Sequence, residues 1–217
     1  MMFGLTVKEL SLLAKLDSPA KIQDFLDGLK INFEENGETC MSPRRVLAAQ
    51  KCHCMEGAML AALALKLHGY KPLILHMKGT GNDWDHILAV FKEKGFWGAI
   101  SKSNHPVLRY REPVYRDIRE LVMSYFHEYT DSNGNKTLRS YSNPFDLSRF
   151  DKRGWMTDGK CLWYIDHCLD RVKHYPVLSP RQSAGLRRAD RIETALDRFH
   201  EWSPGKNRKN RHLVRNY

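Results

Sequence analysis

The chain has 217 residues and a net charge of +10, so its length suits one domain with or without a tail. An apolar share of 42% and an aromatic share of 11% exclude a largely disordered chain. The longest apolar-rich stretch, residues 55–67, contains Glu56 and Lys66 and is too short to span a bilayer, and the N-terminal residues do not resemble a signal peptide. We therefore expect a soluble, cytoplasmic protein with no membrane span.

Three short helices are predicted first. Thr6 and Glu9 form a capping-box pattern, which predicts a helix over 7–15. A Ser-Pro pair at 18–19, and again at 42–43, is typical of an N-cap followed by proline in the first helical turn. These pairs predict a second helix from residue 19 and a third over 44–50, separated by a polar loop over 32–40.

The middle of the chain predicts one long helix followed by strands. Residues 55–68 are rich in good helix formers, and Gly69 stands where a left-handed cap belongs. Apolar runs then predict strands over 72–77, 86–91 and 96–100, with a hairpin turn over 92–95. An amphipathic helix starting at Pro113 and a last helix over about 160–173 follow. This order predicts an α+β fold rather than a βαβ alternation.

The C-terminal segment differs from the rest in charge. From Arg181 onward, eight Arg and two Lys face two Asp and two Glu, so this segment carries +6 of the total charge. We predict one domain over 1–178, with a core at about 42–105, and a basic extension over 179–217 that is partly helical and then flexible. Such a tail is a possible contact for an anionic partner, although no nucleic-acid motif accompanies it.

The cysteines point to thiol chemistry rather than to disulfides. Five cysteines, unevenly spaced, do not make a disulfide framework. Cys54 stands at the predicted start of the long helix, where the helix dipole and free N–H groups stabilise a thiolate. His86 follows 32 residues later, at the start of a strand expected to pack on that helix, and is the candidate base.

At this point the chain resembles the transglutaminase-like superfamily. The run Cys54-Met55-Glu56-Gly57-Ala58, with Gly69-Tyr70 and Pro72 after it, is similar to that family's nucleophile helix and following strand. Residues 85–91, with Gly95, Trp97 and Ile100, are similar to its histidine strand, hairpin turn and partner strand. The resemblance covers about residues 44–104. It implies a papain/transglutaminase-like core, in which the nucleophile helix packs on a small antiparallel sheet with flanking helices.

The resemblance also implies a third residue that orients the histidine, and here the chain departs from the family. Ser101 occupies the position where the family usually has Asp, and a serine supplies no charge. Asn104 is an alternative, while Asp85 should point away from His86 if both lie on one strand. Trp84 and Gln50 are candidates for the substrate cleft or the oxyanion site.

These residues predict attack by the Cys54 thiolate on an amide or acyl carbonyl, by a hydrolase or a transferase acting on a peptide, amide or acyl substrate. No cofactor is implied. Two alternatives stay open: a catalytically impaired binding module that uses the basic tail, and an acyl-CoA-dependent N-acyltransferase, since the family includes enzymes with Glu two residues after the nucleophile.

Simpler interpretations compete with each of these residues. A free cysteine such as Cys54 is most often a small buried core residue, and Cys52 is the rival nucleophile. His53 is expected to be structural or exposed, and Glu56 to be a helix N-terminal acid. Zinc ligation by Cys52, Cys54, His76 and His86 is disfavoured by the Cys-x-Cys spacing, so we expect no metal site.

Overall fold

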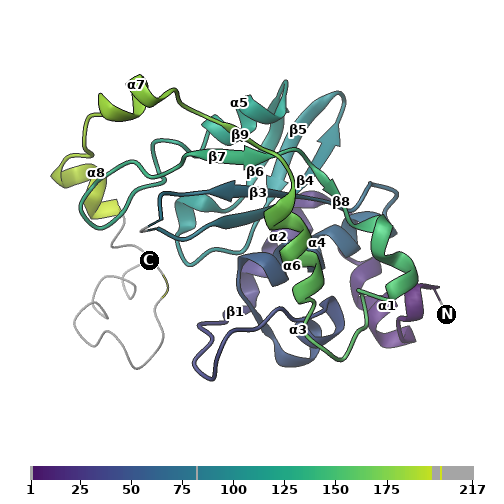
Figure 1. Cartoon of the computed structure of the whole chain (residues 1–217). Helices are drawn as coiled ribbons and strands as arrows, with labels where there is room; N and C mark the ends of the chain where they lie inside the picture. The colour runs from purple at the N-terminus through teal and green to yellow at the C-terminus, as the bar shows by residue number, and fades with distance from the viewer. Residues whose placement is uncertain (1, 82, 197–200, 202–217) are drawn as a thin grey trace.

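The structure is a computed structural model that describes residues 2–81, 83–196 and 201. An antiparallel sheet forms its middle layer, with strand order β6-β5-β4-β3-β7-β9 and with β8 also paired to β3 (Figure 1). A separate pair of two-residue strands, β1 and β2, is parallel. The bounds are β1 Lys30–Ile31, β2 Lys51–Cys52, β3 Leu73–Lys78, β4 His86–Glu93, β5 Phe96–Ile100, β6 Arg111–Tyr115, β7 Ser140–Ser142, β8 Phe145–Asp146 and β9 His174–Pro176.

Helices cover both faces of this sheet. In Figure 1 the layer below the sheet holds α1 (Val7–Ala14), α2 (Pro19–Gly28), α3 (Pro43–Ala49), α4 (Cys54–Leu67) and α6 (Trp163–Arg171), and α5 (Ile118–Met123) lies above it. The C-terminal segment adds α7 (Pro180–Ala184) and α8 (Arg191–Leu196). Short 3-10 helices span Met2–Gly4, Pro106–Leu108 and Leu147–Arg153.

Strand β4 shows why the sheet needs helices on both sides. Its apolar side chains alternate, so that Ile87 and Ala89 pack in the core shared with α1–α4 and α6, whereas Leu88 and Val90 pack in the core shared with α5. All four are buried. A strand buried on both faces reads as a continuous apolar run, which is why residues 86–91 are so easily recognised in the sequence.

Helix α4 lies at the centre of the larger core. Every residue from Met55 to Leu65 is buried, as expected for a helix without a polar face. Gly57 lets another chain segment come close, because a Cβ added there would stand 2.7 Å from Lys102 Cβ. This close packing fixes the start of α4 against the segment that follows β5.

Most predicted elements are confirmed. The first two helices, the long helix and the β4–β5 hairpin are found within one or two residues of their expected bounds. The capping box exists, with Thr6 N–H donating to Glu9 Oε2 at 2.6 Å and Glu9 N–H to Thr6 Oγ1 at 3.2 Å. Gly69 and Gly95 have the positive φ angles of 87° and 91° that their turns require. The α+β class is therefore correct.

The helix predicted from Pro113 is wrong. Residues 111–115 form the edge strand β6, which tolerates proline because an edge residue need not donate to the ladder. The helix begins only at Ile118, where the Asp117 carboxylate accepts from Glu120 N–H at 2.8 Å. The sheet is also larger than expected, because the short strands β7, β8 and β9 extend it beyond β3.

The basic extension is described only in part. Helices α7 and α8 lie within it, and the tail predicted over 203–217 falls outside the described residues. Among the residues that the structure describes, no helix is long and apolar enough to cross a membrane.

Candidate active site

Cys54 is the first residue of α4 and lies in the wall of a cavity of about 220 Å³. The preceding residue, His53, has the extended backbone of an N-cap, with φ −97° and ψ −173°. The Cys54 side chain is half-buried, so it is both shielded and reachable from the cavity. Its backbone N–H belongs to the first helical turn, where no intrahelical acceptor exists.

His86 begins β4 and lines the same cavity. Its Nε2 lies 2.6 Å from Ser101 Oγ and 3.3 Å from the Leu108 carbonyl oxygen. A carbonyl can only accept, so the bond to Leu108 puts a proton on Nε2. In the neutral ring Nδ1 then carries the lone pair and is the nitrogen that can accept a proton. This is the tautomer that a base for the thiol requires.

Ser101 is fixed by contacts of its own. It is fully buried, its N–H donates to Gln23 Oε1 at 3.0 Å, and its carbonyl accepts from Gln23 Nε2 at 3.0 Å. A side chain from α2 thus clamps the backbone that presents the Ser101 hydroxyl to His86. The position predicted from the sequence is therefore next to the ring, and it is a neutral hydroxyl rather than a carboxylate.

A second imidazole reaches Cys54 from the helix side. His53 Nε2 lies 2.9 Å from the Thr39 carbonyl oxygen, which again puts a proton on Nε2. The same nitrogen lies 3.4 Å from Glu56 Oε1 and 3.6 Å from Glu34 Oε1. His53, which the sequence predicts to be structural or exposed, lines the cavity beside the thiol.

Glu56 is the buried partner of His53. Its carboxylate has no exposed surface and accepts from Met41 N–H at 2.9 Å, Thr39 Oγ1 at 2.7 Å and His53 N–H at 3.1 Å. Burial by itself raises the pKa of Glu56, but His53 and these donors lower it to about 2. The group is therefore a carboxylate held inside the protein, in the same first helical turn as Cys54.

The pKa of Cys54 is set by opposing effects. Desolvation raises it, whereas hydrogen bonds with His53 and His86 and the positive charge of these rings hold it well below its usual value. The pKa of His53 shifts in the complementary direction. Burial lowers it, but Cys54 and Glu56 raise it well above its ordinary value. The arrangement favours a Cys54 thiolate beside a His53 imidazolium.

The other cysteines lack this environment. Cys52, the rival nucleophile, is fully buried, and desolvation raises its pKa to about 12. Cys40 is buried as well, and burial raises its pKa far above the usual range. Cys161 and Cys168 reach the surface and do not line the cavity. Among the described cysteines, only Cys54 both lines the cavity and has a lowered pKa.

The remaining predicted residues differ in whether they reach the cavity. Asn104 lines the cavity, but no hydrogen bond among the described residues joins its side chain to His86. Trp84 stands at the cavity rim with 87% of its surface exposed. Gln50 is not brought to the site: it ends α3 at a φ of 51°, and its amide donates to Leu47 O at 2.7 Å. Asp85 precedes β4, and its carboxylate lies 2.9 Å from His76 Nε2.

Comparison with known proteins adds no assignment. No protein-family model and no curated protein matches this chain. The transglutaminase-like resemblance therefore depends on the ordered set of residues around Cys54 and His86, and the function has to be argued from the site.

Proposed function

We propose that the protein is a cysteine-dependent enzyme of the transglutaminase-like type, which attacks the carbonyl carbon of an amide or acyl substrate. The observation that carries the proposal is Cys54 itself, at the first turn of α4 in a cavity wall, with two imidazoles holding its pKa low. Both a lowered pKa and access are needed for a reactive thiol, whereas a structural cysteine has neither.

The two histidines suit different parts of the reaction. His53 is paired with a buried carboxylate, so its role in the proposal is to remain positive and stabilise the thiolate. His86 is held by a neutral hydroxyl and a carbonyl and is in hydrogen-bond contact with the thiol, so it is the proposed proton shuttle. This division compensates for the absence of an aspartate beside His86, because the negative charge is supplied by Glu56, which lies beside His53.

The steps follow from this arrangement. Cys54 Sγ attacks the carbonyl carbon, and the Cys54 backbone N–H stabilises the negative oxygen that forms. His86, which has taken the proton of the Cys54 thiol to form the thiolate, passes that proton to the leaving amine, the C–N bond breaks, and a thioester to Cys54 remains. Water or an amine then attacks the thioester, with His86 taking its proton, and frees the thiolate.

The cavity supports a substrate with an apolar part. Phe33, Leu108, Tyr129 and the exposed indole of Trp84 line it together with Asn104. A ring at the rim is a common way to hold an extended chain or an acyl group over a nucleophile. We therefore expect a peptide or an acyl group rather than a compact ionic substrate.

The test is the alkylation rate of Cys54 by iodoacetamide between pH 4 and 9, followed by peptide mapping because Cys161 and Cys168 also react. We expect rapid labelling well below the free-thiol pKa of about 8.5, and a large loss in His53→Ala and His86→Ala. Labelling that rises only near that pKa in the wild type would make Cys54 an ordinary thiol and end the proposal.

A substrate test follows directly. Activity against model amides and thioesters should be lost in Cys54→Ala and retained in Cys161→Ala, which removes a thiol outside the cavity. Full activity in Cys54→Ala would exclude this residue as the nucleophile.

A further inference from the structure

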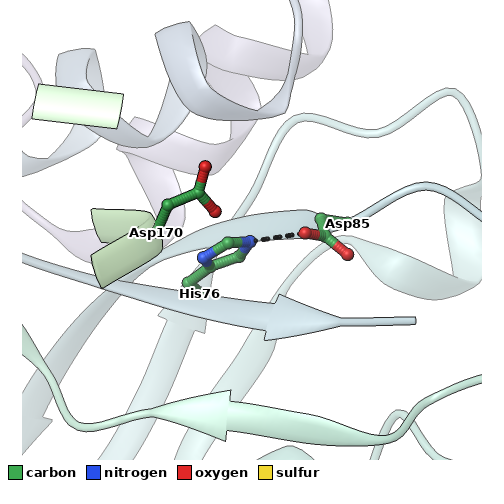
Figure 2. Close-up of side chains that lie close together, drawn as sticks. All are labelled: His76, Asp85 and Asp170. Carbon is green, nitrogen blue, oxygen red and sulfur yellow. Dashed lines mark hydrogen bonds and ion pairs between the residues drawn. The ribbon is translucent and has the colours of Figure 1, made fainter. Parts of the chain in front are cut away.

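A second cluster of chemically active side chains adjoins the Cys54 cavity through Asp85, which lines it. His76 is on β3, Asp85 directly precedes β4, and Asp170 is near the end of α6, and Figure 2 shows the three side chains converging. One possible ligand atom from each residue lies within 4.8 Å of the others. The imidazole is almost entirely buried, while both carboxylates reach solvent.

The hydrogen bonds around His76 determine which of its nitrogens faces the carboxylates. His174 Nδ1 lies 2.8 Å from the Val172 carbonyl oxygen, so it carries a proton and leaves a lone pair on Nε2. That Nε2 lies 3.3 Å from His76 Nδ1, which must therefore donate to it. The two rings meet edge to face, with centroids 5.0 Å apart.

This chain of donors leaves no proton on the His76 nitrogen that faces Asp85. With the proton on Nδ1, a neutral His76 turns the lone pair of Nε2 toward Asp85 Oδ2, which is 2.9 Å away (Figure 2). A lone pair facing a carboxylate is repulsive, and among the described residues Lys78 offsets the charge of Asp170 through an ion pair but forms none with Asp85. A cation beside Nε2, either a second proton on His76 or a metal ion, removes this repulsion.

We propose that His76 Nε2, Asp85 and Asp170 bind a divalent transition-metal ion, with Zn²⁺ as the best-fitting ion, and that His174 orients His76. One imidazole nitrogen and two carboxylate oxygens suit Zn²⁺, whereas Ca²⁺ and Mg²⁺ prefer oxygen ligands alone. A metal-binding histidine normally donates its other N–H to a nearby acceptor, and His174 provides that acceptor.

The charged neighbours are compatible with an ion. Lys78 Nζ lies 2.9 Å from Asp170 Oδ1, which leaves the other carboxylate oxygen for the metal. Asp85 Oδ1 accepts from Gly79 N–H at 3.1 Å and leaves Oδ2 toward His76. The side chains of Asp170 and Asp85 are 53% and 39% exposed, so both can turn the short distance needed to close around an ion.

The position of the site gives it a consequence for the cavity. Asp85 lies between Trp84, at the cavity rim, and His86, beside Cys54. An ion that ties Asp85 to β3 and α6 therefore holds the segment that presents both residues to the cavity. The metal site would act on the thiol site by fixing this segment.

The test is titration of the chelator-treated full-length protein with Zn²⁺ by isothermal calorimetry. We expect one equivalent to bind, with affinity weakened at least about 100-fold in Asp170→Asn, since loss of even an outer-shell partner costs 10–100-fold. Asp170 is exposed, so this variant should fold, as checked by circular dichroism. Asp24→Asn, an exposed carboxylate on α2, is the matched control and should bind like the wild type.

Free thiols also bind Zn²⁺, and two features separate the cases. An ion on Cys54 would be indifferent to Asp170→Asn, and Co²⁺ bound there would give a thiolate-to-cobalt charge-transfer band. Co²⁺ at the proposed site should show only d–d absorption, and should lose it in Asp170→Asn. Absence of binding to the wild type, or binding of equal strength in Asp170→Asn, would overturn the proposal.

Discussion

Replacing Glu56 by glutamine isolates the electrostatic role of the buried carboxylate. The change keeps the size and shape of the side chain and removes one negative charge that lies 3.4 Å from the His53 ring. Glu56 has no exposed surface, so water screens this charge little. An opposite charge at such a distance favours the protonated ring. We therefore expect the pKa of His53 to fall.

The effect on Cys54 combines two opposing contributions. Removing a nearby negative charge by itself favours the thiolate, whereas losing the His53 imidazolium disfavours it. His53 is in hydrogen-bond contact with the thiol, while Glu56 acts from behind the ring. The loss of the imidazolium should win, and the pKa of Cys54 should rise.

Iodoacetamide alkylation measures this shift. Below its inflection the alkylation rate follows the thiolate fraction, so a rise of one unit in the pKa slows labelling about tenfold at a fixed acidic pH. Glu34→Gln is the graded control, because Glu34 lies 3.6 Å from the same nitrogen but its side chain is 31% exposed and better screened. Its effect should be clearly smaller.

One outcome would refute the reasoning. If folded Glu56→Gln protein labels at the wild-type rate, or faster, across the acidic range, the carboxylate does not support a His53 imidazolium. Circular dichroism and thermal melting must accompany the assay, because Glu56 also accepts several hydrogen bonds near the start of α4.

Three further predictions concern the same region. Ser101→Ala removes the hydroxyl 2.6 Å from His86 and should slow Cys54 alkylation several-fold, whereas a wild-type rate would show that the hydroxyl does not hold the ring. Gly57→Ala puts a Cβ 2.7 Å from Lys102 Cβ and should cost about 1–3 kcal/mol in urea unfolding; an unchanged midpoint would mean that this contact relaxes freely. The pKa of Glu56 is lowered from 4.5 to about 2, so its contribution of about 3 kcal/mol is fully present above pH 4.5 and is lost as the pH falls through 2. Acid unfolding of Glu56→Gln should lack this component, and an identical pH dependence of stability would contradict it.

The fold could be predicted where local signals decide it. The Thr6–Glu9 capping box, the left-handed Gly69 and the Lys94-Gly95 turn each act within a few residues, and each is found as expected. The segment around Pro113 shows the limit. Its spacing and proline favour a helix start, but pairing with β5 makes it a strand. The spacing of residues within a segment does not predict which distant segment it pairs with as a strand.

The candidate site likewise has one part that could be predicted from the sequence and one part that could not. Cys54, His86 and Ser101 follow one another in the order that the resemblance implies, and the structure brings them together. The His53–Glu56 pair was missed although it flanks the cysteine, because its meaning depends on the loop over residues 32–39. That loop supplies the Thr39 carbonyl and hydroxyl, which fix the ring and the carboxylate.

Placing the negative charge behind His53 rather than behind His86 changes what each ring can do. In the proposed mechanism, a carboxylate beside His86 would hold the shuttled proton more tightly, whereas the groups that position His86 are the neutral Ser101 hydroxyl and Leu108 carbonyl. The carboxylate beside His53 would keep a positive charge next to the thiolate throughout the proposed reaction. Glu56 can do this because α4 begins at Cys54, so one helical turn carries both the nucleophile and the acid that supports its partner. The serine at position 101 is then compatible with turnover, since the charge that it does not supply is present three residues along from His53.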